Sequence, residues 1–414
     1  MPEFSSGEAD NVLLVTTCIE PDKLNFECAA PMKLKRLRED FVVHEVSDFP
    51  LGSGPFAVYR LEKSGIGTPE AIAEILKVWN IPRRAVSYGG LKDRHATTSQ
   101  SITLFKGPQR SMEQRGFSLE YLGQASREFH AKDIIANRFQ ITLRDLQNDA
   151  AERIALLLPA IAAGVPNYFD DQRFGSLGES GQFVAHPWCL GDYERALYLA
   201  IAEANVHDRP REREQKSLLR QLWGSWTECK ARLDRSHRRS IVTYLVDHPT
   251  DFRRALALLR SDLRSITMAA FQSHLWNEVV SQWLQENLPA GSWFKKPGAA
   301  GLLTFWSTIS PETSAALADL EIPLPSARQH NWPDGIEPLL NRVLEPLGMQ
   351  RHQIRVKYPR DTFFSKGSRR VLLKPEGLSW QLAADELSAG RQKLILNFSL
   401  PRGAYATMVV KCLW

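Results

Sequence analysis

The chain has 414 residues, enough for two domains, because a typical domain has roughly 100 to 200 residues. Its 43% hydrophobic and 24% charged residues are ordinary for a globular protein, and no segment approaches the ~18 consecutive apolar residues of a membrane span. A net charge of +5 permits a polyanionic partner without requiring one, and the acidic, polar start MPEFSSGEADN does not resemble a signal peptide, so we expect a cytoplasmic protein.

The first part of the chain predicts strands interrupted by two helices. Residues 1–30 show no sustained period and predict either a poorly ordered lead-in or a short extra strand at 11–17. Thr68 is expected to cap the first helix, with Pro69 in its first turn. Strands are predicted at 40–46, 55–63, 86–91, 100–106, 117–123 and 138–144, and helices at 68–80 and 149–163.

After Gly175 the sequence becomes helix-rich, basic and rich in tryptophan, which predicts a domain boundary. Apolar residues recurring over 268–284 predict a well-buried amphipathic helix. Residues 289–370, rich in Pro and Gly, predict irregular structure with short helices. Residues 393–413 predict strands, broken by a proline and a glycine.

Residues 209–239 are strongly basic and contain Trp223 and Trp226. Lys and Arg neutralise phosphates and flat aromatic groups stack on bases, so this composition suits RNA. A solvated helical face with acidic neighbours such as Glu212 and Glu214 accounts for it equally well. Composition leaves both interpretations open.

The segment 88–100, YGGLKDRHATTSQ, carries the densest group of reactive side chains. Its two glycines permit a tight loop, which presents Lys92, Asp93, Arg94 and His95 together. An adjacent cation would keep Asp93 ionised, as a nucleophilic carboxylate requires. Because solvated turns with such charges are common, the loop by itself indicates a candidate site and no particular reaction.

This segment resembles the G-x-K-D-[RK]-x-A-x-T-x-Q motif of the TruD family of pseudouridine synthases. Five more blocks resemble family segments in the same order: REDFVVHEV at 38–46, NRFQITLR at 137–144, VPNYFDDQRFG at 165–175, FQSHLWN at 271–277 and FSLPRGAYAT at 398–407. Several blocks in one order are far more specific than a single motif. By this resemblance the chain is identified as a member of the family.

The resemblance implies an α+β fold: a pseudouridine synthase-type mixed, largely antiparallel sheet with flanking helices, interrupted by an inserted helix-rich TRUD domain. It places a lead-in at 1–30 and a discontinuous catalytic domain at 31–175 and 376–414. The insertion would occupy 176–375, where its Arg-rich helices would clamp RNA.

The resemblance also assigns the residues that act directly on the uridine. Asp93 matches the family's catalytic aspartate, Lys35 falls where the family places a basic residue near that carboxylate, and Phe41 matches an aromatic residue lining the uridine site. Isomerisation exchanges no electrons or external groups, so no cofactor is expected. Asp93 would act either by covalent attack or by abstracting a sugar proton to form a glycal, and the resemblance leaves both routes open.

A second set of residues matches family positions for substrate binding. Asn137 and Phe139 form the N-x-F pair, whose ring would pack on the target base, and Tyr405 falls where the family has Phe or Tyr near the substrate. Lys92 and Arg94 are candidates for contacts with the RNA backbone.

The five cysteines are scattered and never spaced C-x-x-C, which speaks against a zinc site or a disulfide framework.

Three residues depart from the usual family pattern: Arg38, Ala136 and Asp170. None replaces a reacting group. They bear on local loop geometry, and Asp170 would add negative charge close to the site.

The function implied is an RNA pseudouridine synthase of the TruD type, an isomerase acting on structured RNA, with position 13 of a tRNA as the leading target. We expect a monomer with no metal or membrane partner. An alternative is a catalytically silent RNA-binding protein or tRNA chaperone on the same scaffold, but a binder would have no need of Asp93 in the path of an anionic ligand. A glycosidase or metal enzyme lacks support from paired carboxylates or ligand clusters.

Overall fold

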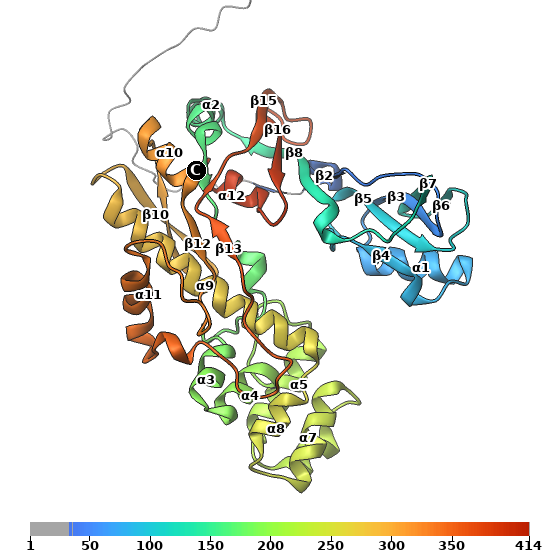
Figure 1. Cartoon of the computed structure of the whole chain (residues 1–414), viewed down its shortest axis with the longest axis vertical. Helices are drawn as coiled ribbons and strands as arrows, with labels where there is room; N and C mark the ends of the chain where they lie inside the picture. The colour runs from blue at the N-terminus through green and yellow to red at the C-terminus, as the bar shows by residue number, and fades with distance from the viewer. Residues whose placement is uncertain (1–32, 35, 414) are drawn as a thin grey trace, which may run out of the picture.

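The structure, a computed structural model, describes residues 33–34 and 36–413 (Figure 1). The segment 1–30, for which a lead-in or a short strand was expected, and the site residue Lys35 lie outside the described residues. The strands of the main sheet are β1 (Lys33–Leu34), β2 (Phe41–Ser47), β3 (Phe56–Ser64), β4 (Val86–Tyr88), β5 (Thr97–Phe105), β6 (Met112–Gln114), β7 (Phe117–Ala125), β8 (Ile134–Leu146), β15 (Glu376–Ala384) and β16 (Gln392–Pro401). Their order is β15-β16-β8-β2-β5-β3-β7-β6, with β1 beside β8 and β4 beside β5.

The sheet is mixed, because β2 pairs with β5 in parallel while the other pairings of the described strands are antiparallel. β8 joins the two halves, pairing with β2 on one side and β16 on the other. In this register Phe139 of β8 stands opposite both Val43 and Phe398. The predicted α+β class with a largely antiparallel sheet and flanking helices is confirmed.

Separate hydrophobic clusters stabilise the two halves of the sheet. Helix α1 (Thr68–Trp79) buries Ile72 and Ile75 with side chains of β3, β5 and β7. Helices α2 (Asn148–Ala163) and α12 (Ala406–Lys411) pack with β8 and β16 in a second cluster. The predicted helices at 68–80 and 149–163 are thus confirmed within two residues at each end.

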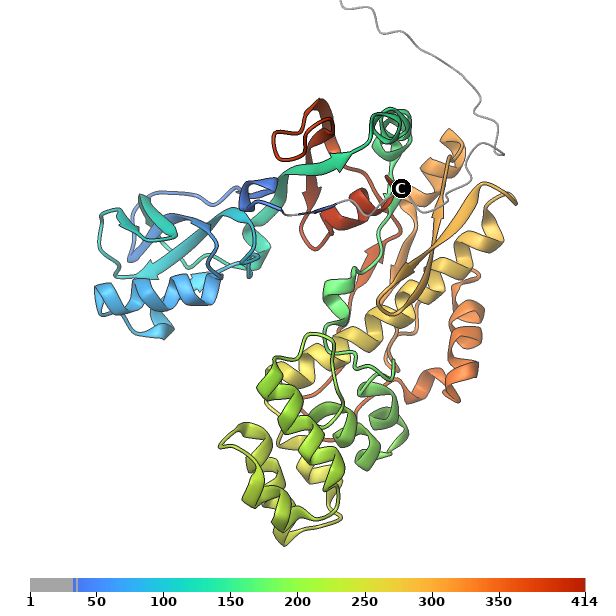
Figure 2. The same cartoon turned by 180° about the vertical axis from the view of Figure 1, so that it is seen from behind.

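A helical part lies in the sequence between β8 and β15, and buried side chains between Tyr168 and Leu372 form its hydrophobic cluster. Helix α9 (Ser261–Asn287) runs through this part, with α3 to α8 gathered towards one of its ends (Figure 2). The helix predicted at 268–284 is its central portion, and no glycine or proline interrupts the 27 residues. The other helices are α3 (Ala185–Leu190), α4 (Tyr193–Ile201), α5 (Pro210–Gln221), α6 (Trp226–Arg232), α7 (His237–Asp247) and α8 (Phe252–Ala257).

Residues 289–370 are more regular than their composition predicts. Strands β10 (Trp293–Gly298) and β11 (Gly301–Trp306) form an antiparallel hairpin. Pro297, Gly298 and Gly301 lie at its turn, so these residues mark a hairpin end where an irregular segment was expected. The segment also contains α10 (Pro311–Asp319), β12 (Glu321–Pro323), α11 (Ile336–Leu344) and β13 (Ser368–Arg370). Outside it, the short strands β9 (Val165–Pro166) and β14 (Leu372–Leu373) pair with each other.

The C-terminal segment is a strand followed by a helix, so the prediction of strands throughout 393–413 is wrong for its second half. Gly403, with φ of 83°, turns the chain after β16, and α12 follows. Met408, Val409 and Val410 are at most 1% exposed, and their burial overrides the β-propensity of valine.

The basic segment 209–239 is partly paired within the chain. Arg211, Lys216, Arg232 and Arg238 each form an ion pair with an acidic neighbour. Trp226 is 4% exposed and belongs to the core, so it is a structural residue. In the part of the chain that the structure describes, no helix is both long enough and apolar enough to cross a membrane.

Candidate active site

Asp93 lies on the loop 89–96 between β4 and β5, and its side chain is half-buried. The loop begins at Gly89, where a β-carbon would lie 2.5 Å from Cδ1 of Ile134, so only glycine fits without displacing that side chain. It ends at Ala96, which is fully buried in the cluster that contains side chains of β2 and β8. Both ends of the loop are therefore fixed against the sheet.

Buried hydrogen bonds tie the loop to β5 and α1. The Gln100 side-chain N–H donates to the Gly90 carbonyl at 3.1 Å, and the Thr68 hydroxyl donates to the Gln100 amide oxygen at 2.8 Å. The Thr68 hydroxyl in turn accepts from the Lys92 N–H at 3.0 Å. The prediction that Thr68 caps α1 is wrong: Gly67 holds the cap position, and the threonine side chain serves the loop instead.

Lys63 supports the loop from β3. Its ammonium group donates to the carbonyl oxygens of Ile66 at 3.0 Å, Lys92 at 3.2 Å and Asp93 at 2.7 Å. The residue is 2% exposed. Burial lowers the pKa of Lys63 to about 8, although attraction to Asp93 works in the other direction.

Lys92 connects the loop to β2 and β8. Its Nζ donates to Oδ1 of Asn137 at 2.5 Å and lies 3.2 Å from Oε2 of Glu45 in an ion pair. The Glu45 side chain is fully buried, and its other oxygen accepts from the Ser101 N–H at 3.0 Å. Two predicted site residues, Lys92 and Asn137, are thus in direct contact beside Asp93.

Phe41 and Phe139 are also brought together. Their ring centroids are 6.2 Å apart with an edge-to-face geometry, and Phe139 stacks on Phe398 at 5.6 Å. Phe41 is 5% exposed and Phe139 8%. The rings therefore form a hydrophobic floor, two residues along β8 from Asn137, with little open surface of their own.

Tyr405 belongs to a second aromatic group, at the start of α12. Its ring centroid is 6.4 Å from that of Phe169, and the Arg369 guanidinium lies 4.4 Å from the Phe169 ring and 5.7 Å from the Tyr405 ring. Arg369 also donates to the Asn167 carbonyl at 2.6 Å, and burial lowers its pKa to about 10. Tyr405 is thus held against the VPNYF block and the helical part.

Arg94 points elsewhere. Its guanidinium lies 3.6 Å from the Glu70 carboxylate of α1, and both side chains are about half exposed. The structure therefore gathers Lys92, Asn137 and the two phenylalanines beside the Asp93 loop, while Arg94 and Tyr405 contact other groups.

The charge of Asp170, one of the departures from the family pattern, is balanced locally. Its carboxylate is 3% exposed and accepts from the Thr407 hydroxyl at 2.6 Å and from Lys411 Nζ at 2.8 Å. Lys411 also reaches Asp171 at 2.8 Å. Burial alone would lower the pKa of Lys411, but these carboxylates raise it. Asp170 therefore fastens α12 and adds little uncompensated charge to the site.

Replacing Lys411 by methionine should destabilise the protein by about 3 kcal/mol, because the Asp170 carboxylate is then buried without its cation. Denaturant unfolding of the single variant measures the loss. The double variant Asp170→Asn/Lys411→Met should recover part of it, since the amide carries no charge. A Lys411→Met loss equal to that of the double variant would contradict the assigned pairing.

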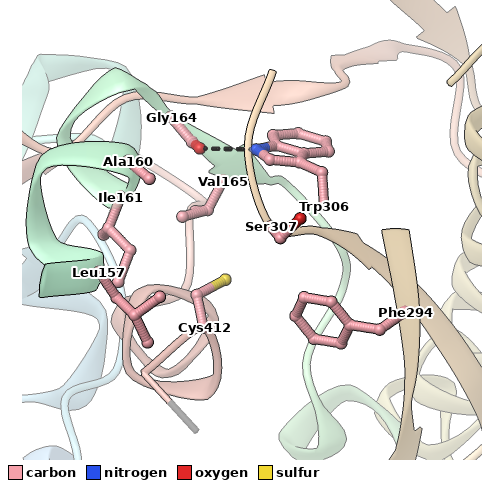
Figure 3. Close-up of a pocket in the computed structure, with 9 residues that line it drawn as sticks. All are labelled: Leu157, Ala160, Ile161, Gly164, Val165, Phe294, Trp306, Ser307 and Cys412. Carbon is pink, nitrogen blue, oxygen red and sulfur yellow. Dashed lines mark hydrogen bonds between the residues drawn. The ribbon is translucent and has the colours of Figure 1, made fainter. Parts of the chain in front are cut away.

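The pocket drawn in Figure 3 lies away from this site, between α2, the β10–β11 hairpin and α12. Its lining includes the apolar side chains of Leu157, Ile161, Val165, Phe294, Trp306 and Cys412. Burial raises the pKa of the Cys412 thiol to about 12, so the thiol is unsuited to nucleophilic chemistry. Within the described residues, no group of three His, Cys, Asp or Glu side chains is arranged to hold a metal ion.

The residues that fix the loop were not singled out from the sequence. Gln100 is the last residue of the G-x-K-D motif. Glu45 lies on the same face of β2 as the buried Phe41 and Val43, because the three residues are spaced two apart. Lys63 follows Leu61 on the buried face of β3. Strand alternation could have identified Glu45 and Lys63 as charged residues facing the interior.

The chain is similar to known proteins over most of its length. The family model described as tRNA pseudouridine synthase D (TruD) matches residues 27–413. The chain is 28% identical over 391 residues to "Probable tRNA pseudouridine synthase D 1" of Methanococcus maripaludis, covering 92% of this chain and 98% of that protein. It is 28% identical over 389 residues to the tRNA pseudouridine synthase D of Leptospira interrogans, covering 91% of this chain and 95% of that protein.

The fold agrees as well. The crystal structure of the "Putative tRNA pseudouridine synthase D (TruD)" of Methanosarcina mazei superposes with a TM-score of 0.71 at 23% identity, covering 92% of this chain and 93% of that chain. The likeness extends over the sheet and the helical part together. The chain therefore belongs to the TruD family of tRNA pseudouridine synthases, and it is an isomerase of that type.

Proposed function

We propose that the chain isomerises one uridine of a folded tRNA, at position 13, to pseudouridine, with Asp93 as the carboxylate that starts the reaction. The observation that carries the proposal is the fixed loop: buried side chains of β3, β5 and α1 bond its backbone, and its Lys92 meets Asn137. A carboxylate held in this way needs little reorganisation when the substrate arrives.

The reaction breaks the bond between ribose C1′ and N1 of uracil, turns the base and joins C1′ to C5. The proton on C5 is lost and N1 gains one, so atoms and electrons balance without a redox partner. Asp93 begins this either by attacking the sugar or base covalently, or by abstracting a sugar proton to form a glycal. Both routes need an ionised carboxylate close to the reacting sugar and base.

The target base must leave its stack, at a cost of a few kcal/mol, before Asp93 can reach the sugar. Since the Asn137 carbonyl oxygen accepts from Lys92, the amide N–H groups of Asn137 would serve as donors for a uracil oxygen. The edge of Phe139 would contact the base, supported from below by Phe41. Tyr405, which is more exposed than either phenylalanine, would stack on a neighbouring group of the RNA.

Two parts of the chain would share the work. Residues 31–175 and 376–414 would form the catalytic domain, where Lys35 would act beside Asp93. Residues 176–375 would clamp the tRNA. Arg209, Arg213 and Arg235 support this role, because they are exposed and make no ion pair with any described residue. Arg94 would add a phosphate contact from the loop side.

The proposed target can be tested with the purified chain and tRNA transcripts that carry U or C at position 13. Pseudouridine is mapped by carbodiimide labelling and reverse transcription. We expect one modification, at position 13, in the U transcript and none in the C transcript. Modification at another position would refute the assigned target, and tight binding without any modification would favour an RNA-binding protein or tRNA chaperone.

A further inference from the structure

We propose that Lys63 is a positioning residue for Asp93: its ammonium group holds the loop backbone at residues 92 and 93 and thereby sets the direction of the Asp93 carboxylate. The inference rests on the proposed role of Asp93. Lys63 itself lies beneath the loop backbone and is not expected to touch the RNA, since it is 2% exposed.

The contacts of Lys63 join three segments that meet at the site. The residue lies near the end of β3, opposite Thr98 of β5. Its ammonium group reaches the Ile66 carbonyl, in the turn before α1, at 3.0 Å. The same group reaches the Lys92 and Asp93 carbonyls at 3.2 and 2.7 Å. One cation therefore ties the loop to the turn that precedes α1.

The three carbonyl acceptors around Lys63 match the protonated form of its side chain. A lysine ammonium group has three N–H donors and no acceptor, and the three carbonyl oxygens match them one for one. A neutral amine has two N–H donors, so deprotonation leaves one of these partly buried carbonyls without its lysine donor. Because a partly buried carbonyl that loses its donor is costly, the loop is expected to move when Lys63 loses its proton.

The charges that face Lys63 come from α1 and from the loop. Burial lowers the pKa of Lys63 to about 8, Asp93 and Glu70 oppose that shift, and Lys92 adds to it. Lys63 is thus protonated at neutral pH and neutral above about pH 8. If it positions Asp93, the rate of isomerisation should fall as the pH rises through about 8.

Deprotonation of Lys63 should lower the rate but should not lower the free energy of unfolding. The two quantities therefore distinguish a role in positioning Asp93 from a role in folding. The folded-state pKa of Lys63 is about 8, below the usual 10.5 of an unfolded lysine. Between these values the unfolded chain binds more protons than the folded chain, so this group makes the free energy of unfolding rise with pH. A fall in rate above pH 8 is therefore not loss of the fold through Lys63.

The chain offers a matched control. Lys296 of β10 is half-buried, with its pKa also lowered to about 8 by burial, and it donates to the Lys411 carbonyl at 2.8 Å. That acceptor lies on α12, whereas Lys63 bonds the carbonyls of residues 92 and 93. Lys296→Met therefore removes another lysine of lowered pKa while leaving the Lys63 hydrogen bonds in place.

The experiment measures single-turnover isomerisation of tRNA between pH 6.5 and 9.5, together with tRNA affinity. We expect Lys63→Met to be roughly 10²-fold slower at neutral pH, because a small displacement of the reacting group has that effect, with unchanged affinity and no fall near pH 8. Lys63→Arg keeps its charge at high pH and should recover much of the rate, also without the fall. Lys296→Met should keep both the rate and the fall of the wild type.

A Lys63→Met variant with the rate and pH profile of the wild type would overturn the proposal. If that variant does not fold, the wild-type profile decides, since a rate that stays flat from pH 7 to 9.5 also overturns it. Asp93→Asn is measured alongside. If Asp93→Asn is inactive while Lys63→Met is unaffected, only the positioning role fails, whereas an active Asp93→Asn variant removes the proposed catalyst itself.

Discussion

Asp93→Asn is expected to abolish isomerisation while leaving tRNA binding intact. The amide is close in size to the carboxylate but is neither a nucleophile nor a base, so either route loses its first step. The loop should keep its shape, because Lys63 bonds the backbone carbonyl of residue 93 and Thr68 the backbone N–H of Lys92. Loss of a reacting group typically lowers the rate at least about 10⁴-fold. Single-turnover kinetics and a binding isotherm with the same tRNA measure the two effects.

Asp149→Asn is the matched control for that variant. Asp149 is exposed on α2 and pairs only with Arg153 of its own helix among the described residues. It should retain the wild-type rate and affinity. A rate for Asp93→Asn within tenfold of the wild type would exclude Asp93 as the reacting group.

Arg144→Met should have the largest effect on stability, a loss of about 3–5 kcal/mol. The Arg144 guanidinium on β8 donates to Asp40 at 2.7 Å and to Asp385 at 2.9 Å, and it lies 3.0 Å from Glu386. Asp40 is 1% exposed and Asp385 5%, so removal of the cation leaves two buried carboxylates uncompensated. Denaturant unfolding at pH 7 measures the loss, and Arg153→Met, which breaks an exposed pair, should cost at most about 1 kcal/mol.

The loss should shrink in acid. Burial opposes ionisation of Asp385, but the amides of Leu387 and Asp145 and the Arg144 guanidinium together hold its pKa below the usual 3.8. A depressed carboxylate pKa contributes stability that is present above the unfolded value and is lost as the pH falls through the folded one. The difference between wild type and Arg144→Met should therefore decline below about pH 4. A difference independent of pH would show that packing, and not charge, dominates.

Local patterns were sufficient for the elements that lie on one face of a buried core. The alternation in β8 and the 3.6-residue period in α1 and α9 predicted those elements, since each buries a stripe of its own side chains. The same logic failed for α12. Its Val409 and Val410 favour a strand, but contacts with β8 and β16, made only after folding, bury them on a helix.

The sequence was sufficient to name residues of the candidate site, but not to predict which of them are in contact. The motif and its companion blocks named Lys92 and Asn137 separately, and only the folded chain brings them within 2.5 Å. Lys63, 29 and 30 residues before the carbonyls it bonds, carries no local signal of that partnership. For Trp226 the composition left an RNA contact and a structural role both open, and the fold decides for the structural role, since its indole N–H donates to the Pro249 carbonyl within the core.

The most direct test of the account is the structure of the Asp93→Asn variant bound to its tRNA. We expect the target uridine to be turned out of its stack, with ribose C1′ about 3.5 Å from the substituted side chain and the uracil edge bonded to Asn137. A target uridine that remains stacked in the tRNA, or that binds beside Arg369 and away from the 89–96 loop, would contradict it.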